Sequence, residues 1–150
     1  MSDGDSCRLK YFEGEPEVLA EVRQMWDEIF DDPEEFADYY FTEICKQNKI
    51  LLAYKGDVLA GMIHLNPYEM QVEGKKELCY YIVGVAVKPE YREQGIMHKM
   101  MQRVLADMKK DGRAFAFLMP EREEYYESLG FEKVFHTLEL DIDIAELEDE

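Results

Sequence analysis

The chain has 150 residues, 47% of them apolar, and its 34 acidic and 17 basic side chains give a formal net charge of −17 at pH 7. This length and apolar content suit one globular domain. The acidic field would repel a phosphate backbone, so nucleic acid is not expected as a partner. The polar start is unlike a secretory signal, and the longest apolar run is too short to span a bilayer. Three cysteines without a pairing or metal pattern suit a reducing compartment. We therefore expect a cytoplasmic protein with no membrane contact.

The first half of the chain changes between helical and strand periods. Phe36, Tyr40 and Ile44 recur every fourth residue behind Pro33, a residue that suits a first helical position. Glycine-containing turns at 56–57 and 73–74 separate apolar runs that are typical of strands. In chain order the predicted elements are a strand at 9–12, helices at about 17–30 and 33–46, and strands at 50–55, 58–65 and 76–88.

The second half returns to a helical period after Val87. Ile96, Met100, Val104 and Met108 are each four residues apart, and basic residues and a glycine close this helix near residue 112. The elements predicted next are a buried strand at 114–119, a short helix at 121–130, a last strand at 131–140 and an acidic tail at 141–150. With no internal repeat and no linker, residues 1–150 are expected to form a single domain.

The turn between the strand that ends near Val87 and the helix that begins at Ile96 contains the pattern R-x-x-G-x-M. A helix N-terminus points free N–H groups at whatever lies over such a turn, which makes it an anion site. Neither the Walker A pattern nor the three glycines of a dinucleotide fingerprint are present. From this hexapeptide alone, a plain strand-to-helix turn with a geometrically required glycine stays open as an alternative.

The wider pattern V-x-V-x-P-x-Y-R-x-x-G-I, followed by an apolar helix, a strand and Y-x-x-x-G-F, resembles the GNAT superfamily of N-acetyltransferases. The matching residues are Val85, Val87, Pro89, Tyr91, Arg92, Gly95 and Ile96, and later Tyr126, Gly130 and Phe131. Met97 stands where the family usually has a small residue. The YRxxGIM turn and the FLMP segment are also similar to the N-acetyltransferase domain of the enhanced intracellular survival type, whose members carry a further C-terminal domain.

The resemblance implies an α/β fold with a mixed, mostly antiparallel (α+β) sheet, one parallel strand pair splayed for acetyl-CoA, and helices on both faces. It implies acetyl-CoA as the co-substrate, with its pyrophosphate on the N–H groups of the turn. Gly84, inside an otherwise β-branched and aromatic run, predicts a bulge or a close backbone approach, and a freed N–H near it could polarise the thioester carbonyl. A packing gap opposite an aromatic side chain is the alternative explanation of this glycine. The expected cofactor-binding residues are Val85, Ala86, Val87, Arg92, Glu93, Gln94, Gly95, Ile96, Met97 and His98.

The resemblance places the general acid that protonates the leaving thiolate at Tyr126, four residues before Gly130. Many family members have a glutamate inside the strand before the motif, whereas here Glu77 lies nearer the strand entrance and would act through a chain of water. His64 and His136 stay open as alternative bases. The histidines share no metal-ligand spacing, and no cysteine has an evident histidine partner, so we expect no metal and no covalent enzyme intermediate.

The first two predicted helices form a wall of the acceptor site in this family, and here they are strongly acidic, with interleaved aromatic residues. Carboxylates and aromatic faces attract ammonium groups, which makes a small cationic amine or a lysine-rich peptide a reasonable acceptor. A solvated acidic face over an aromatic core is the alternative. We therefore expect an N-acetyltransferase that acts by direct attack of a primary amine. The competing hypothesis is a non-catalytic acyl-CoA-binding sensor or interaction module. A homodimer is a weaker expectation.

Overall fold

The structure is a computed structural model, and it describes residues 7–113 and 115–118. Short helical turns supplement the regular elements: a π-helical turn at Tyr40–Ile44 and 3₁₀ turns at Cys45–Gln47 and Pro89–Tyr91. The helices and strands are β1 (Cys7–Tyr11), α1 (Pro16–Ile29), α2 (Glu34–Tyr39), β2 (Lys49–Lys55), β3 (Val58–Val72), β4 (Lys75–Val87), α3 (Ile96–Lys110) and β5 (Phe115–Phe117).

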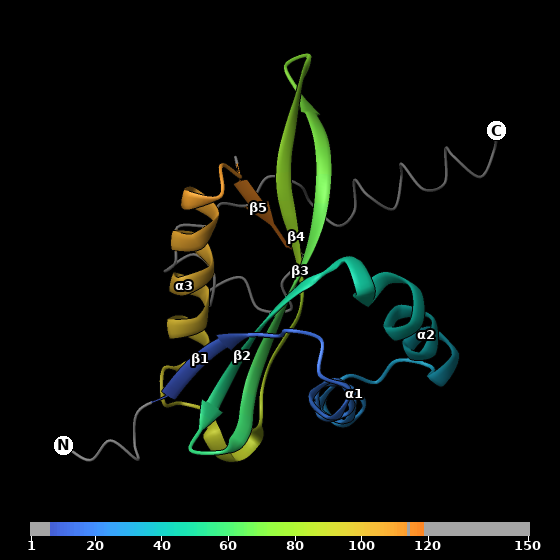
Figure 1. Cartoon of the computed structure of the whole chain (residues 1–150), viewed down its shortest axis with the longest axis vertical. Helices are drawn as coiled ribbons and strands as arrows, with labels where there is room; N and C mark the ends of the chain where they lie inside the picture. Colours follow the sequence, from blue (N-terminus) through green and yellow to red (C-terminus); the bar gives the residue numbers. More distant parts are fainter. Residues whose placement is uncertain (1–6, 114, 119–150) are drawn as a thin grey trace. The chain divides into compact units, whose positions relative to one another are not determined.

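The described strands form one mixed sheet in the order β1-β2-β3-β4-β5. β1 to β4 pair antiparallel in sequence order, and β5 lies parallel to β4. α3 packs on one face of this sheet, and α1 and α2 lie on the other (Figure 1). The predicted mixed α/β sheet with helices on both faces and one parallel pair is confirmed.

Among the described residues, β4 and β5 pair over only a short stretch. Pairing runs from Cys79 opposite Phe115 to Tyr81 opposite Phe117, where the two aromatic rings stack with centroids 4.8 Å apart. β4 continues beyond this point through residues 82–87, and the described part of β5 offers these residues no partner. The family's splayed strand pair predicts such an arrangement, in which the described part of the chain leaves one edge of β4 unpaired beyond Tyr81.

Two apolar layers hold the helices to the sheet. Val22, Met25 and Trp26 of α1 join Ile50 and Leu52 of β2 in one buried cluster. On the other face α3 buries its predicted stripe, Ile96, Met100, Val104 and Met108, with its neighbour Met101. Each fully buried side chain of this size stabilises the fold by about 1.5–3 kcal/mol. This burial therefore holds α1 and α3 firmly against the two faces of the sheet.

The predicted second helix is wrong after Tyr39. Its α-helical part is only Glu34–Tyr39, and the chain then widens into the π-helical turn Tyr40–Ile44. The rings of Tyr40 and Phe41 both pack on Trp26, with centroid separations of 4.7 and 5.5 Å. Packing on α1 therefore outweighs the simple four-residue period.

The predicted strand 58–65 is too short, because β3 runs on to Val72. β4 supplies a pairing partner for these extra residues out to Val72 opposite Lys75, although Asn66 and Pro67 are typical turn residues. β2 ends its pairing at Leu65, so the outer part of the hairpin extends beyond β2 (Figure 1).

The last predicted elements, 121–130 and 131–140, and the acidic tail 141–150 lie outside the described residues, and the single-domain prediction stays a prediction. No helix among residues 7–113 combines the length and the apolar character needed to cross a bilayer.

Candidate active site

The segment that leaves the end of β4 is fixed to the sheet. The N–H of Lys88 donates to the carbonyl of Ala60 at 2.8 Å, and Gly61 lets β3, β4 and α3 approach closely. A Cβ at Gly61 would lie 3.0 Å from Met100 Cε and 3.1 Å from the Ala86 carbonyl oxygen. The end of β4 and the body of α3 are therefore held in one fixed relation, which determines where the turn between them lies.

The turn itself uses two residues in the left-handed region. Glu93 has φ +64° and Gly95 has φ +79°, and α3 begins directly after Gly95. The N–H of Lys99 makes the first intrahelical bond, to the Gly95 carbonyl at 3.0 Å. The N–H groups of the three residues before Lys99 precede that ladder and point out of the helix end. A left-handed residue followed by helical ones gathers such groups into an anion-binding concavity.

Two basic side chains connect this turn to neighbouring backbone carbonyl groups. Arg92 Nε donates to the Val87 carbonyl oxygen at 2.9 Å, which ties the turn to the end of β4. Lys99 Nζ donates to the backbone carbonyl of Cys7 on β1. Met97 is half-buried and His98 is exposed. The positive charge here is local, since the chain as a whole is strongly acidic.

The predicted irregularity at Gly84 is confirmed. Gly84 has φ +60°, and the pairing of β3 with β4 shifts between Met62 opposite Ala86 and His64 opposite Val83. β4 therefore has one residue more than β3 over this stretch, which is a β-bulge and leaves a residue outside the ladder. The bulge lies in the part of β4 that has no partner in the described part of β5.

Of the proposed bases in the described residues, His64 lies at this bulge and Glu77 lies away from it. Glu77 is half-buried on β4, six residues before Val83, which is about 20 Å along an extended strand. His64 is fully buried, and burial lowers its pKa to about 3. An imidazole with that pKa is a very weak base. Tyr126 and His136 lie outside the described residues.

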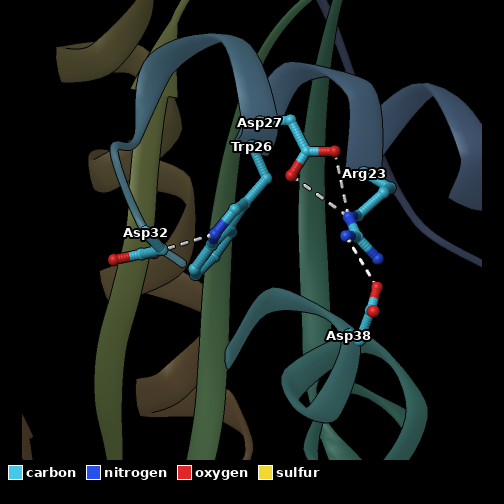
Figure 2. A network of polar contacts seen from close by, with 5 residues as sticks. All are labelled: Arg23, Trp26, Asp27, Asp32 and Asp38. Atoms are coloured by element: carbon cyan, nitrogen blue, oxygen red, sulfur yellow. Dashed lines mark hydrogen bonds and ion pairs between the residues drawn. The ribbon is translucent and has the colours of Figure 1, made fainter. Parts of the chain in front are cut away.

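Arg23 neutralises part of the negative charge of α1 and α2. Arg23 on α1 contacts Asp27 through Nε at 3.1 Å and Asp38 of α2 through Nη2 at 2.9 Å, and Trp26 Nε1 donates to Asp32 at 3.0 Å (Figure 2). Outside these contacts α2 exposes two aromatic side chains, Phe36 at 49% and Tyr39 at 58%. Exposed acidic residues of α1, α2 and the connection between them include Glu28, Asp31, Glu34 and Glu35.

One part of the site was not evident from the sequence. Trp26 and His64 occupy the space where a side chain of Gly84 would lie, although α1 is far from β3 and β4 along the chain. The sequence did mark Gly84 as unusual, but it held no signal for which side chains face it. Within the described ranges, no three His, Cys, Asp or Glu side chains come together in a way that could hold a metal ion.

Comparison with known proteins identifies the class to which this fold and site belong. The model of the acetyltransferase (GNAT) domain matches residues 13–134. The chain therefore belongs to the GNAT acetyltransferase family, a family of N-acetyltransferases. No curated protein matches the chain.

Solved structures share the fold. A conserved protein of Enterococcus faecalis V583, described as a probable N-acyltransferase, matches with a TM-score of 0.78 and 23% identity over 87% of this chain. The chain spans only 33% of that protein's length. A GCN5-related N-acetyltransferase of Ralstonia eutropha JMP134 gives 0.69 and 19%, covering 88% of this chain and 96% of its own. A GNAT family acetyltransferase of Brucella melitensis, solved with acetyl-CoA, gives 0.66 and 20%, covering 84% of each chain.

Proposed function

We propose that the protein transfers the acetyl group of acetyl-CoA to a primary amine of a small cationic acceptor or peptide. The observation that carries the proposal is the continuous backbone path from the bulge at Gly84, along the end of β4 that the described part of β5 leaves unpaired, to the N–H groups at the start of α3. A thioester, an amide-containing arm and a pyrophosphate are linked in that order in acetyl-CoA, and the path offers each of them backbone partners.

The turn would hold the pyrophosphate. Three N–H groups that precede the intrahelical ladder, together with the positive end of the α3 dipole, would stabilise a bound anion without a charged side chain. Arg92 and Lys99 would then stabilise the conformation of the turn, because each already donates a hydrogen bond to a backbone carbonyl. The cofactor-binding role proposed for Val85, Ala86 and Val87 is to pair their open backbone edge with the amide groups of the arm.

The bulge would polarise the reacting carbonyl. A backbone N–H that the ladder leaves unused near Gly84 can donate to the thioester oxygen as negative charge develops on it. The amine nitrogen forms its bond to the carbonyl carbon while the carbon–sulfur bond breaks. One proton leaves the nitrogen and one joins the sulfur, so an acetamide and a free thiol result.

The two protons need partners. We propose Tyr126 as the acid that protonates the sulfur, on the strength of its place in the Y-x-x-x-G-F motif. For the base we keep Glu77, which would receive the proton of the amine through a chain of water because it lies about 20 Å along β4 from the bulge. His64 suits this role less well than Glu77, because burial lowers its pKa and the ring would hold a proton from the amine only weakly.

The exposed face of α2 supports a cationic acceptor. Phe36 and Tyr39 present their rings to solvent next to Glu34 and Glu35. An ammonium group gains from both the carboxylates and the aromatic faces. We therefore propose polyamines, aminoglycoside-like compounds and basic peptides as the first acceptors to test.

The test combines acetyl-CoA binding by calorimetry with release of free thiol in the presence of these amines, for the wild type and for Tyr126→Phe. We expect binding in both proteins and a large loss of thiol release in the variant. Unchanged release would remove Tyr126 from the acid role. Binding without release in the wild type, with every amine, would favour a non-catalytic acyl-CoA sensor.

A further inference from the structure

Two aromatic rings lie directly against the bulged backbone of β4. A Cβ placed on Gly84 would lie 2.6 Å from Trp26 Cζ3 and 2.7 Å from His64 Cδ2. Trp26 comes from α1 and His64 from β3, so the bulge is held between a helix and the neighbouring strand. The position of these rings therefore limits the conformation that the bulge can adopt.

The Trp26 ring is fixed by a polar contact. Its Nε1 donates to Asp32 Oδ2 at 3.0 Å, and Asp32 lies in the exposed connection between α1 and α2 (Figure 2). The ring also stacks on Tyr40, with centroids 4.7 Å apart and planes 20° apart. A rotation of the indole would break both contacts.

The His64 ring is fixed in the same way. Asn48 Nδ2 donates to the Tyr40 hydroxyl oxygen at 2.9 Å, so the hydroxyl hydrogen can donate to His64 Nδ1 at 2.7 Å. The proton of the neutral imidazole then resides on Nε2, which lies 3.4 Å from Met62 Sδ. Tyr40 opens the π-helical turn, a rare element that is often found at functional sites.

We propose that Asp32 and Tyr40 are positioning residues for the acetyl-transfer step, because they orient Trp26 and His64, whose rings set the bulge at Gly84. The inference rests on the proposed function, in which an N–H of this bulge polarises the thioester carbonyl. None of the four side chains has to touch the substrate. Their effect passes through the backbone, since a donor stabilises developing charge only when it is already aimed at it.

Polarisation can be measured without an acceptor amine. Acetyl-CoA labelled with carbon-13 at the carbonyl is bound to the protein, and its resonance is compared with that of free acetyl-CoA. In the wild type we expect a downfield displacement on binding. In Tyr40→Phe and in Asp32→Ala we expect most of that displacement to be lost, while the dissociation constant of acetyl-CoA stays as in the wild type because the α3 turn is untouched.

Matched variants separate positioning from general damage. Tyr68→Phe removes a hydroxyl from an exposed tyrosine of β3, and Asp57→Ala removes an exposed carboxylate from the β2–β3 turn; both should keep the full displacement. Asp32→Asn retains an acceptor for the indole N–H and should restore much of what Asp32→Ala loses. Asp32 is exposed, so its variants are expected to fold even if Tyr40→Phe does not.

The outcomes distinguish the two proposals. A full displacement in both Tyr40→Phe and Asp32→Ala would overturn the positioning roles and leave the proposed function intact. Bound acetyl-CoA without any displacement in the wild type would refute carbonyl polarisation by the bulge, and with it both proposals. Failure of the wild type to bind acetyl-CoA would refute the proposed function at its first step.

Discussion

Gly84 is the residue on which the proposed polarisation of the thioester depends most. Its φ of +60° is one that L side chains rarely adopt, and the space where a Cβ would lie is already occupied by two rings. The two restrictions are independent, because one comes from the backbone of the residue itself and the other from α1 and β3. They can be separated by comparison with a glycine that has only the first restriction.

Gly84→Ala should therefore destabilise the protein more than Gly74→Ala. Gly74, in the turn between β3 and β4, has φ +82° and open space around its Cβ position. We expect a loss of about 1–2 kcal/mol for Gly74→Ala from the backbone alone. For Gly84→Ala we expect about 3 kcal/mol, because the rings must also move. Urea unfolding measures both, and equal losses would mean that Trp26 and His64 do not confine this residue.

His64 should make stability depend on pH. Burial lowers its folded pKa from the ordinary 6.5 to about 3, so between these values the unfolded chain binds a proton that the folded chain does not. The free energy of unfolding should then fall by about 1.4 kcal/mol for each unit of pH decrease within this window. Above 6.5 the histidine is neutral in both states and contributes no slope.

The measurement is urea unfolding at several pH values, with the slope of His64→Gln subtracted from that of the wild type. If the free energy of unfolding had the same pH dependence in the wild type and in His64→Gln, His64 would be protonated in the folded protein as readily as in the unfolded chain.

At the scale of elements, the turn before α3 should bind coenzyme A through its backbone shape. Gly95→Ala leaves the side-chain space open but places alanine at φ +79°, which favours a different turn by about 1–2 kcal/mol. We expect acetyl-CoA binding to weaken by about 10-fold, since this penalty must be overcome when the N–H groups converge on the anion.

Gly56→Ala is the matched control for this variant. Gly56 has φ +61° and open space in the β2–β3 turn, so its replacement has the same backbone penalty away from the site. Calorimetric titration should show wild-type affinity for Gly56→Ala. An unchanged affinity in Gly95→Ala as well would contradict the assignment of the turn as the anion site.

The sequence predicted those helices and strands whose buried residues recur at a regular spacing. The four-residue stripe of α3 and the apolar runs of β2 and β4 correspond to buried faces, and the oddity of Gly84 marked the bulge. The break after Tyr39 could not be predicted, because it follows from packing on Trp26. The polar chain from Asn48 through Tyr40 to His64 could not be predicted either, because no local period relates its three members.

At the scale of the whole molecule, the net charge of −17 should act oppositely on the two substrates. It attracts a cationic amine and repels anionic acetyl-CoA. The screening length falls from about 30 Å at 0.01 M salt to about 8 Å at 0.15 M. We therefore expect kcat/KM for a polyamine to fall over this range and kcat/KM for acetyl-CoA to rise, as initial-rate measurements would show. The same direction for both substrates would exclude steering by the global field.

We propose that the end of β4 beyond Tyr81 and the turn before α3 bind acetyl-CoA for transfer to an amine. Calorimetric titration with acetyl-CoA, followed in the same sample by a free-thiol assay against polyamines, aminoglycosides and basic peptides, tests it most directly. We expect one acetyl-CoA to bind per chain and free thiol to appear with at least one cationic amine. Absence of binding in the wild-type protein would contradict it.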